Sequence, residues 1–214
     1  MSDEPAIVEG EVAAELAEEW PGLRIASCAV DAGPAATPPE LRERLRLLSD
    51  RFRGPQAIAL RQLPIPHAYR VFFRHIGLEP DDERIPVEAL ALERMQKGGF
   101  PSRNSLDDAI TIAVMETHVP VWALDADCLS GPLHLRAAVE GEPLGRGDVV
   151  IDLPGGRLVV ADDAGAVAVL FRQIAPGVGV TPRTRSMTLF SVAVPGVPPI
   201  HVEEALWTVW DILS

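Results

Sequence analysis

The sequence predicts an α+β fold with mixed or antiparallel sheets and packed helices, in a single domain over residues 1–214. Before residue 118, apolar residues recur mostly at helical spacing. From residue 119 onward, short apolar runs alternate with turn signals such as PGG and DDAG. A length of 214 residues and a hydrophobic content of 47% suit one sizeable globular core.

The first helix is expected over residues 8–19, because Val12, Leu16 and Trp20 recur every four residues. The run LRIASCAV, residues 23–30, follows it. This run is apolar on both faces, which predicts a strand in the middle of a sheet.

A capping box predicts where the next helix begins. Thr37 is the expected N-cap, Pro38 the first helical residue, and Glu40 the acid that reaches back to the cap. One face of this helix is expected to be buried and the other to carry outward arginines. The buried residues are expected to be Leu41, Leu45, Leu48 and Phe52.

Three more helices are expected before residue 118. One ends at Gly77, and the next begins at Pro86 and ends at Gly98. The third is capped by Asn104 or Ser105 and carries acids in its first turn, where the helix dipole favours carboxylates. Its buried stripe is expected to be Ile110, Ala113 and Val114.

Strands are predicted in the second half wherever turn signals bound an apolar run, namely at 119–124, 133–139, 149–153, 157–161, 166–171 and 187–194. A C-terminal helix is expected over about 202–213. Its inner side is expected to carry Leu206, Trp207 and Trp210.

Composition excludes several classes of protein. The net charge of −12 argues against a general nucleic-acid or DNA binder, because neutralising phosphates requires cations. No apolar run approaches the roughly 18 residues of a membrane span, and the acidic N-terminus is unlike a secretion signal, so a cytoplasmic protein is expected. Cys28 and Cys128 are expected to be free, buried thiols, and the five histidines show no ligand spacing. We therefore expect no metal and no cofactor.

Residues 40–75 depart from the acidic average, with eight arginines against three acids. Such a basic segment could bind a polyanion locally, and Arg42, Arg46 and Arg53 are the candidate RNA-binding residues. The alternative is that these arginines are only the solvated face of a helix.

Several short motifs in order carry a resemblance to a known family. They are WPGLR, HAYRVFF..IG, P-V-E-A-L-x-x-x-R, N-x-x-x-D, P-V-x-A-x-D and G-P-L-H-L-R-x-A-x-x-G-E. Over about residues 19–195, the chain resembles a freestanding relative of the tRNA-editing (B-three/B-four type) domain of the phenylalanyl-tRNA synthetase beta subunit. The resemblance implies a pocket that accepts the aminoacyl end of tRNA and hydrolyses wrongly attached amino acids, tyrosine above all.

The resemblance also implies which residues belong to the site. The positions that match the family pattern are Glu88, Arg94, Asn104, Asp108, Asp125, Arg136, Glu142, Asp162, Arg172 and Thr184. Three departures concern groups that would position a water or an oxyanion. Trp122 stands in the place of a histidine, Thr111 in the place of an asparagine, and residues 187–194 lack the family's late glutamate.

The candidate substrate-binding residues each have a structural alternative. Asn104, Asp108 and Thr111 could border a pocket, or they could simply begin a helix. Trp122 could stack on a base or an aromatic amino acid, or it could be core. Asp125 ends the strand that carries Trp122.

Three further residues are judged on local spacing. Glu88 and Arg94 are expected to serve in structural ion pairs, with Asp108 or Asp125 as a partner for Arg94. His118 follows a helix pattern, and a catalytic role is not expected of it.

No catalytic constellation stands out in the sequence: there is no G-x-S-x-G elbow, metal-ligand cluster or phosphate-binding glycine loop. The leading hypothesis is a tRNA-linked protein that deacylates mischarged, tyrosyl-tRNA(Phe)-like aminoacyl-tRNA in trans, with weak tRNA binding. The rival is a non-catalytic module of the same fold that binds an RNA end or a small ligand. The sequence leaves open whether the protein is an enzyme.

Overall fold

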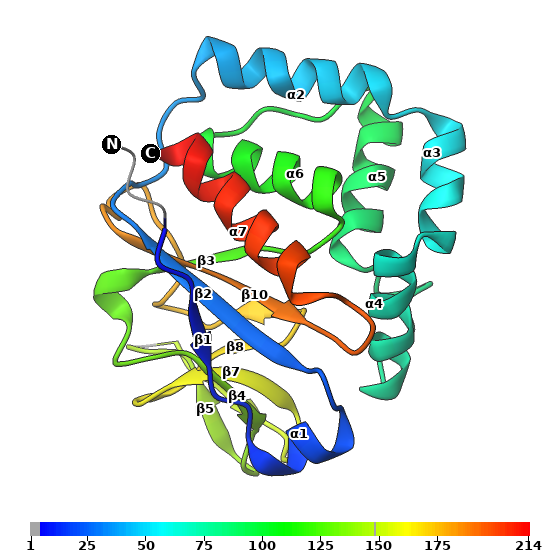
Figure 1. Cartoon of the computed structure of the whole chain (residues 1–214). Helices are drawn as coiled ribbons and strands as arrows, with labels where there is room; N and C mark the ends of the chain where they lie inside the picture. The colour runs from blue at the N-terminus through cyan, green and yellow to red at the C-terminus, as the bar shows by residue number, and fades with distance from the viewer. Residues whose placement is uncertain (1–4, 148) are drawn as a thin grey trace. The chain divides into compact units, whose positions relative to one another are not determined.

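The computed structural model describes residues 5–147 and 149–214, and it confirms the α+β class with antiparallel sheets (Figure 1). The chain divides into two compact units, each assembled from two stretches of sequence. Unit 1 contains the residues up to Gly33 together with Trp122–Pro195, and unit 2 contains Pro34–Val121 and Gly196–Ser214. In the described residues, every strand lies in unit 1 and every α-helix except α1 lies in unit 2.

The first sheet of unit 1 has the strand order β1-β2-β10-β3, with all neighbours antiparallel. These strands are β1 (Val8–Gly10), β2 (Arg24–Val30), β3 (Trp122–Asp125) and β10 (Met187–Ala193). Since β1 and β10 both pair with β2, the prediction of a central strand at residues 23–30 is confirmed to within one residue.

The second sheet of unit 1 has the order β4-β7-β8-β9, and a separate hairpin pairs β5 with β6. The strands are β4 (His134–Ala137), β5 (Glu142–Leu144), β6 (Ile151–Leu153), β7 (Leu158–Asp162), β8 (Gly165–Val169) and β9 (Gln173–Ile174). Strands β7 and β8 are the inner strands of this sheet, and all five residues of β7 are buried.

The predicted helix over residues 8–19 is wrong in its first half. Val8–Gly10 form β1, which pairs with β2, and only Ala14–Glu19 form a helix, α1. Gly10 explains part of the difference. A Cβ at this position would overlap the carbonyl oxygen of Leu133, so the residue is needed for a close backbone approach and not for a helix.

Unit 2 is helical. Its helices are α2 (Pro39–Arg51), α3 (Gly54–Ala59), α4 (Pro64–His75), α5 (Pro86–Lys97), α6 (Ser105–Thr117) and α7 (Pro199–Leu213), with a short 3₁₀ turn at Leu60–Gln62. Helix α6 packs against α2, α5 and α7, and Figure 1 shows α7 running alongside it. Consistent with this central place, ten residues of α6 are buried, so its buried surface is wider than the predicted stripe of three residues. Ile110, which belongs to that predicted stripe, is only half-buried.

The predicted chemistry is confirmed at three helix ends. Asn104 is the N-cap of α6, Gly98 ends α5 in the left-handed conformation, and Gly77 follows α4 with φ +77°. The predicted capping box of α2 is wrong. That helix begins at Pro39, one residue later than expected, and no side chain caps it.

The predicted inner position of Trp207 is wrong, because this residue of α7 is exposed, whereas Leu206 is buried. In the described part of the chain, no helix combines the length and the apolar character that crossing a membrane requires.

Candidate functional site

Asn104, Asp108 and Thr111 lie together at the start of α6, in unit 2. The Asn104 side chain accepts a hydrogen bond from the Asp107 N–H at 2.9 Å and donates one to the Asp107 carboxylate at 2.9 Å. The Thr111 hydroxyl donates to the Asp107 carbonyl at 2.8 Å. Their polar groups therefore serve the first turn of the helix.

Asp108 is fully buried, and both of its carboxylate oxygens accept hydrogen bonds within unit 2. The Thr37 and Ser102 hydroxyls donate to Oδ2 at 2.7 and 2.6 Å, and the Arg103 N–H donates to Oδ1 at 2.9 Å. The Thr37 hydroxyl is thus used by Asp108 and not by α2. This network ties the loops before α2 and before α6 to the first turn of α6.

Trp122 begins β3 in unit 1 and stands directly opposite Phe190 of β10. Their rings stack with centroids 5.5 Å apart at an interplanar angle of 19°. The Phe171 ring packs on Trp122 at 5.6 Å and 53°, from the turn after β8. These three rings border a cavity of only about 10 Å³, roughly the space of one water molecule. Trp122 is half-buried, and these ring contacts favour its packing within unit 1 over a free platform for a ligand.

Asp125, at the other end of β3, is used locally. Its carboxylate accepts hydrogen bonds from the Thr184 hydroxyl and from the Asp127 N–H. Asp125 and Thr184, two positions that the resemblance implies, are therefore in contact through this hydrogen bond. Thr184 is also buried. The five candidate substrate-binding residues thus fall into two sets, three in unit 2 and two in unit 1.

Of the two residues expected in structural ion pairs, Glu88 pairs with an arginine, whereas Arg94 binds a backbone carbonyl. Glu88 is buried and accepts from the buried Arg70 guanidinium at 3.0 and 2.8 Å, so it does form a structural ion pair. Arg94 instead donates to the Ser49 carbonyl at 2.9 Å. Asp108 is not the partner of Arg94, because its carboxylate accepts hydrogen bonds from other residues of unit 2.

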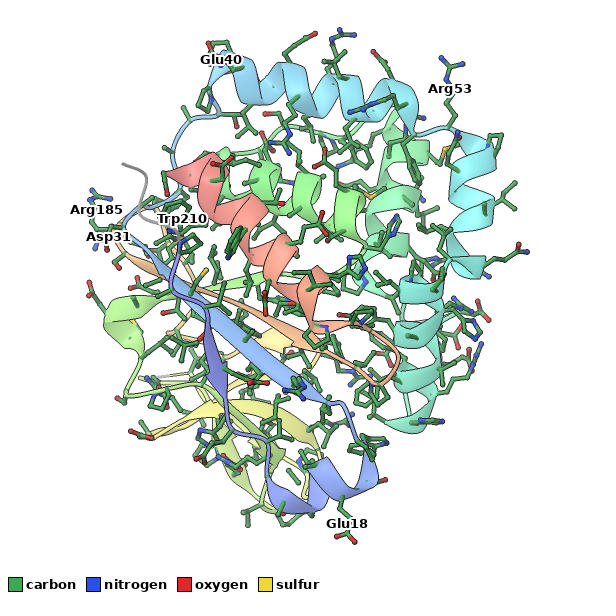
Figure 2. The ribbon with its side chains drawn as sticks, viewed as in Figure 1. Glu18, Asp31, Glu40, Arg53, Arg185 and Trp210 are labelled. Atoms are coloured by element: carbon green, nitrogen blue, oxygen red, sulfur yellow. The ribbon has the colours of Figure 1, made fainter. Side chains whose placement is uncertain are left out.

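The arginines of residues 40–75 are largely neutralised inside unit 2. Five of the eight form ion pairs with carboxylates, namely Arg44, Arg46, Arg61, Arg70 and Arg74. Arg46 lies between Glu43 and Asp50, at 2.7 and 2.6 Å. Arg42 and Arg53 donate to backbone carbonyls, and Figure 2 shows Arg53 projecting outward from the end of α2.

Unit 1 contains two ion pairs at positions that the resemblance implies. Arg136 of β4 binds Glu142 of β5 in a bidentate pair, and this hydrogen bonding lowers the pKa of Glu142. Asp162 of β7 pairs with Arg146 and accepts from the N–H groups of Ser130 and Ala164. Burial alone would raise the pKa of Asp162, but these donors outweigh it, so the pKa lies below its ordinary value.

Both cysteines are free, but only Cys28 is buried, and Cys128 is half-buried. Burial raises the pKa of the Cys28 thiol to about 11. His118 ends α6 with φ +63°, and burial together with His201 lowers the pKa of His118. Among the residues that the structure describes, no cluster of three or more histidine, cysteine or acidic side chains is suited to a metal ion.

Sequence reasoning missed a pocket of about 410 Å³ in unit 1, bordered by β1, β2, β10 and the segment 126–133. None of the predicted site residues lines it. It also missed Arg146, Phe171 and Phe190, which act through tertiary partners far away in the sequence. The buried acids Glu88 and Asp162 were the available signal, because a buried carboxylate requires a partner.

Comparisons with known proteins give a partial, distant similarity. No family model matches the chain. The phenylalanine–tRNA ligase beta subunit of Neisseria meningitidis serogroup A is 38% identical over 77 residues, 36% of this chain and 10% of that protein. Its counterparts from Xylella fastidiosa and Cutibacterium acnes are each 31% identical, over 110 and 105 residues, 50% and 49% of this chain and 13% and 12% of theirs.

The chain therefore spans only about a tenth of the length of the curated relatives it matches. Among solved structures, an N-terminal fragment of the phenylalanyl-tRNA synthetase beta-subunit from Pyrococcus horikoshii is 15% identical. The TM-score is 0.41, and the match covers 53% of this chain and 41% of that fragment. The sequence similarities confirm the resemblance to the beta subunit in part, and the narrower assignment to its editing domain stays a prediction.

Proposed function

We propose that this chain is a tRNA-associated binding module, related to part of the synthetase beta subunit, that binds the aminoacyl end of a tRNA without acid–base hydrolysis. A cytoplasmic location belongs to the same proposal. Its tRNA component is supported by the partial similarity to phenylalanine–tRNA ligase beta subunits.

The non-catalytic component rests on one observation, the stack of Trp122 on Phe190. Trp122 stands where the resemblance implies a histidine, and Phe190 lies in the stretch where it implies an acid. Neither an indole nor a phenyl ring can take or give a proton in a hydrolytic step. General acid–base help is typically worth about 10²–10⁴ in rate, so its loss favours binding over turnover.

The polar candidate residues Asp108 and Asp125 also argue against a catalytic role. Asp108, which could have recognised the α-amino group of an aminoacyl ester, has three donors on its two oxygens and no exposed surface. Releasing it for a ligand would break the loop network that it holds. Asp125 likewise accepts from Thr184 and Asp127.

The second candidate is the trans-acting deacylase, which the resemblance to the editing domain implies. An aminoacyl ester is already activated, so positioning and main-chain dipoles alone could accelerate its hydrolysis. Such an enzyme would be slow. Replacing His118 by alanine would leave its rate almost unchanged, because no general base is assigned to that residue.

One paired experiment separates the two candidates. Purified protein is mixed with a panel of aminoacyl-tRNAs that includes tyrosyl-tRNA(Phe), and both retention on a filter and release of free amino acid are measured. We expect salt-sensitive binding with hydrolysis at the spontaneous rate. Hydrolysis above that rate would replace the binding module by the deacylase, and absence of both binding and hydrolysis would reject the two proposals together.

A further inference from the structure

The pocket of about 410 Å³ in unit 1 has a floor made by one face of the first sheet. Strand register places Val8 opposite Ser27 and Ala29 opposite Thr188, so these side chains share a face. Gly10 lies two residues after Val8, and the Leu133 carbonyl packs directly against its backbone. The small side chains of Ser27, Ala29 and Thr188 leave a space in the size range of small-molecule sites.

The wall of the pocket is the segment 126–133, and hydrogen bonds from several elements fix it. The Ser130 N–H donates to Asp162 at 2.7 Å, and the Ser130 carbonyl accepts from the Asp163 N–H at 2.8 Å. Arg146 binds the carbonyl of Cys128 as well as Asp162. At the other end, the Leu133 carbonyl lies against Gly10. The wall is thus pre-formed, which lowers the ordering cost of binding.

The chemistry of the lining is neutral. Among the residues that the structure describes, no carboxylate, guanidinium, amine or imidazole lines the pocket, and the polar side-chain groups are the hydroxyls of Ser27 and Thr188. The alternation along β2 points Cys28 to the opposite face from Ser27 and Ala29, so it contributes backbone. Within the described residues, no group hydrogen-bonds the Thr188 hydroxyl, whereas Ser27 has a long 3.5 Å bond to the Val8 carbonyl.

We infer that this pocket binds an uncharged small molecule with an aliphatic body and an amide or hydroxyl group. The aliphatic body would lie on Ala29, Leu129 and Leu133, and the polar group would meet the Thr188 and Ser27 hydroxyls. A charged ligand would be disfavoured because it would lose water without gaining an ionic partner. This inference is independent of tRNA binding.

Three probes with the same leucyl body test it: neutral N-acetyl-leucinamide, anionic N-acetyl-leucine and cationic leucinamide. Binding is followed by amide NMR of the isotope-labelled full chain. The neutral probe is expected to bind at about millimolar strength, with shifts centred on Gly10, Ser27 and Leu133. Both charged probes are expected to bind about tenfold or more weakly, each factor of ten being about 1.4 kcal/mol.

Two pocket-filling variants and one matched control complete the experiment. Ala29→Leu and Ser27→Leu, which fill the space from neighbouring positions, should each abolish the neutral probe's shifts. Ala14→Leu, on the exposed side of α1, should leave them unchanged. Thr188→Val should weaken binding a few-fold. Equal binding of the three probes, shifts centred elsewhere, retention in both filled variants, or no shift from any probe would each overturn the inference.

Discussion

Thr37 and Asp108, 71 residues apart in the sequence, are joined by a buried hydrogen bond of 2.7 Å. The bond links the loop before α2 to the first turn of α6. It also explains why a threonine in a good capping sequence does not cap its own helix, since a fully buried carboxylate takes its hydroxyl. Asp108 is therefore a structural anchor of unit 2.

The first prediction follows from this network. Asp108→Ala should lower the free energy of unfolding by about 2–4 kcal/mol, because three donors to a carboxylate lose their acceptor inside the protein. Thr37→Val should cost about 1–2 kcal/mol. Urea unfolding measures both changes. Asp107→Ala is the matched control, because Asp107 is less buried; an Asp108→Ala protein as stable as this control would mean that Asp108 is not an anchor.

The second prediction concerns Trp122. Trp122 is half-buried but packed against two rings, so its replacement by alanine should lower the free energy of unfolding by about 3 kcal/mol, the lower end of the range for a core tryptophan. A double-mutant cycle with Phe190 should give a coupling of about 0.5–1.5 kcal/mol from the stacked rings. Trp207→Ala, on an exposed tryptophan of α7, is the control and should cost far less. If Trp122→Ala is instead nearly neutral for stability, the ring is available to a ligand.

The third prediction concerns RNA. Replacing Arg42, Arg46 and Arg53 together should weaken tRNA binding and reduce the salt slope by about one for each phosphate that these side chains no longer neutralise. The structure assigns most of this effect to Arg42 and Arg53, because Glu43 and Asp50 already neutralise Arg46. Binding measured against salt concentration should show Arg46→Ala alone close to wild type. An unchanged slope in the triple variant would mean that RNA binds elsewhere on the chain.

The fourth prediction is a pH dependence set by Asp162 and Arg146. A carboxylate with a lowered folded-state pKa stabilises the protein above its unfolded pKa, about 3.9, and this contribution is lost as the pH falls through the folded pKa. Arg146→Met should therefore cost about 2 kcal/mol at pH about 7, the usual scale of a hydrogen bond to a charged group. It should cost much less once Asp162 is protonated. Urea unfolding at pH about 7 and at a pH below the folded pKa of Asp162 tests this, with Arg183→Met as an exposed control. An equal cost of Arg146→Met at the two pH values would contradict the ionic role.

The sequence predicted elements whose signals are local. The central strand at residues 23–30, the Asn104 cap and the Gly98 helix end each depend on adjacent residues, and each is confirmed. The short strands β1, β5 and β9 were missed. Strands of two or three residues have almost no periodicity of their own and exist because a partner strand pairs with them.

The candidate site was less predictable, because partner choice is a tertiary matter. Glu88 was expected to need a partner, but nothing in the spacing indicated Arg70, 18 residues earlier in another helix. The aromatic cluster likewise draws Trp122, Phe171 and Phe190 from three elements. The wide 410 Å³ pocket arises from small residues whose common face becomes visible only once strand register is known.

The interleaving of the two units has a consequence for biosynthesis. The chain enters unit 2 after Gly33, returns to unit 1 at Trp122, and enters unit 2 again at Gly196. On the ribosome, β2 must therefore wait for β10, which is made more than 150 residues later, before it gains its second neighbour. Helix α6 similarly waits for α7. When the ribosome has made the chain only to about residue 121, unit 1 lacks Trp122–Pro195 and unit 2 lacks Gly196–Ser214. Nascent chains paused near residue 121 should therefore carry exposed apolar surface and engage holding chaperones.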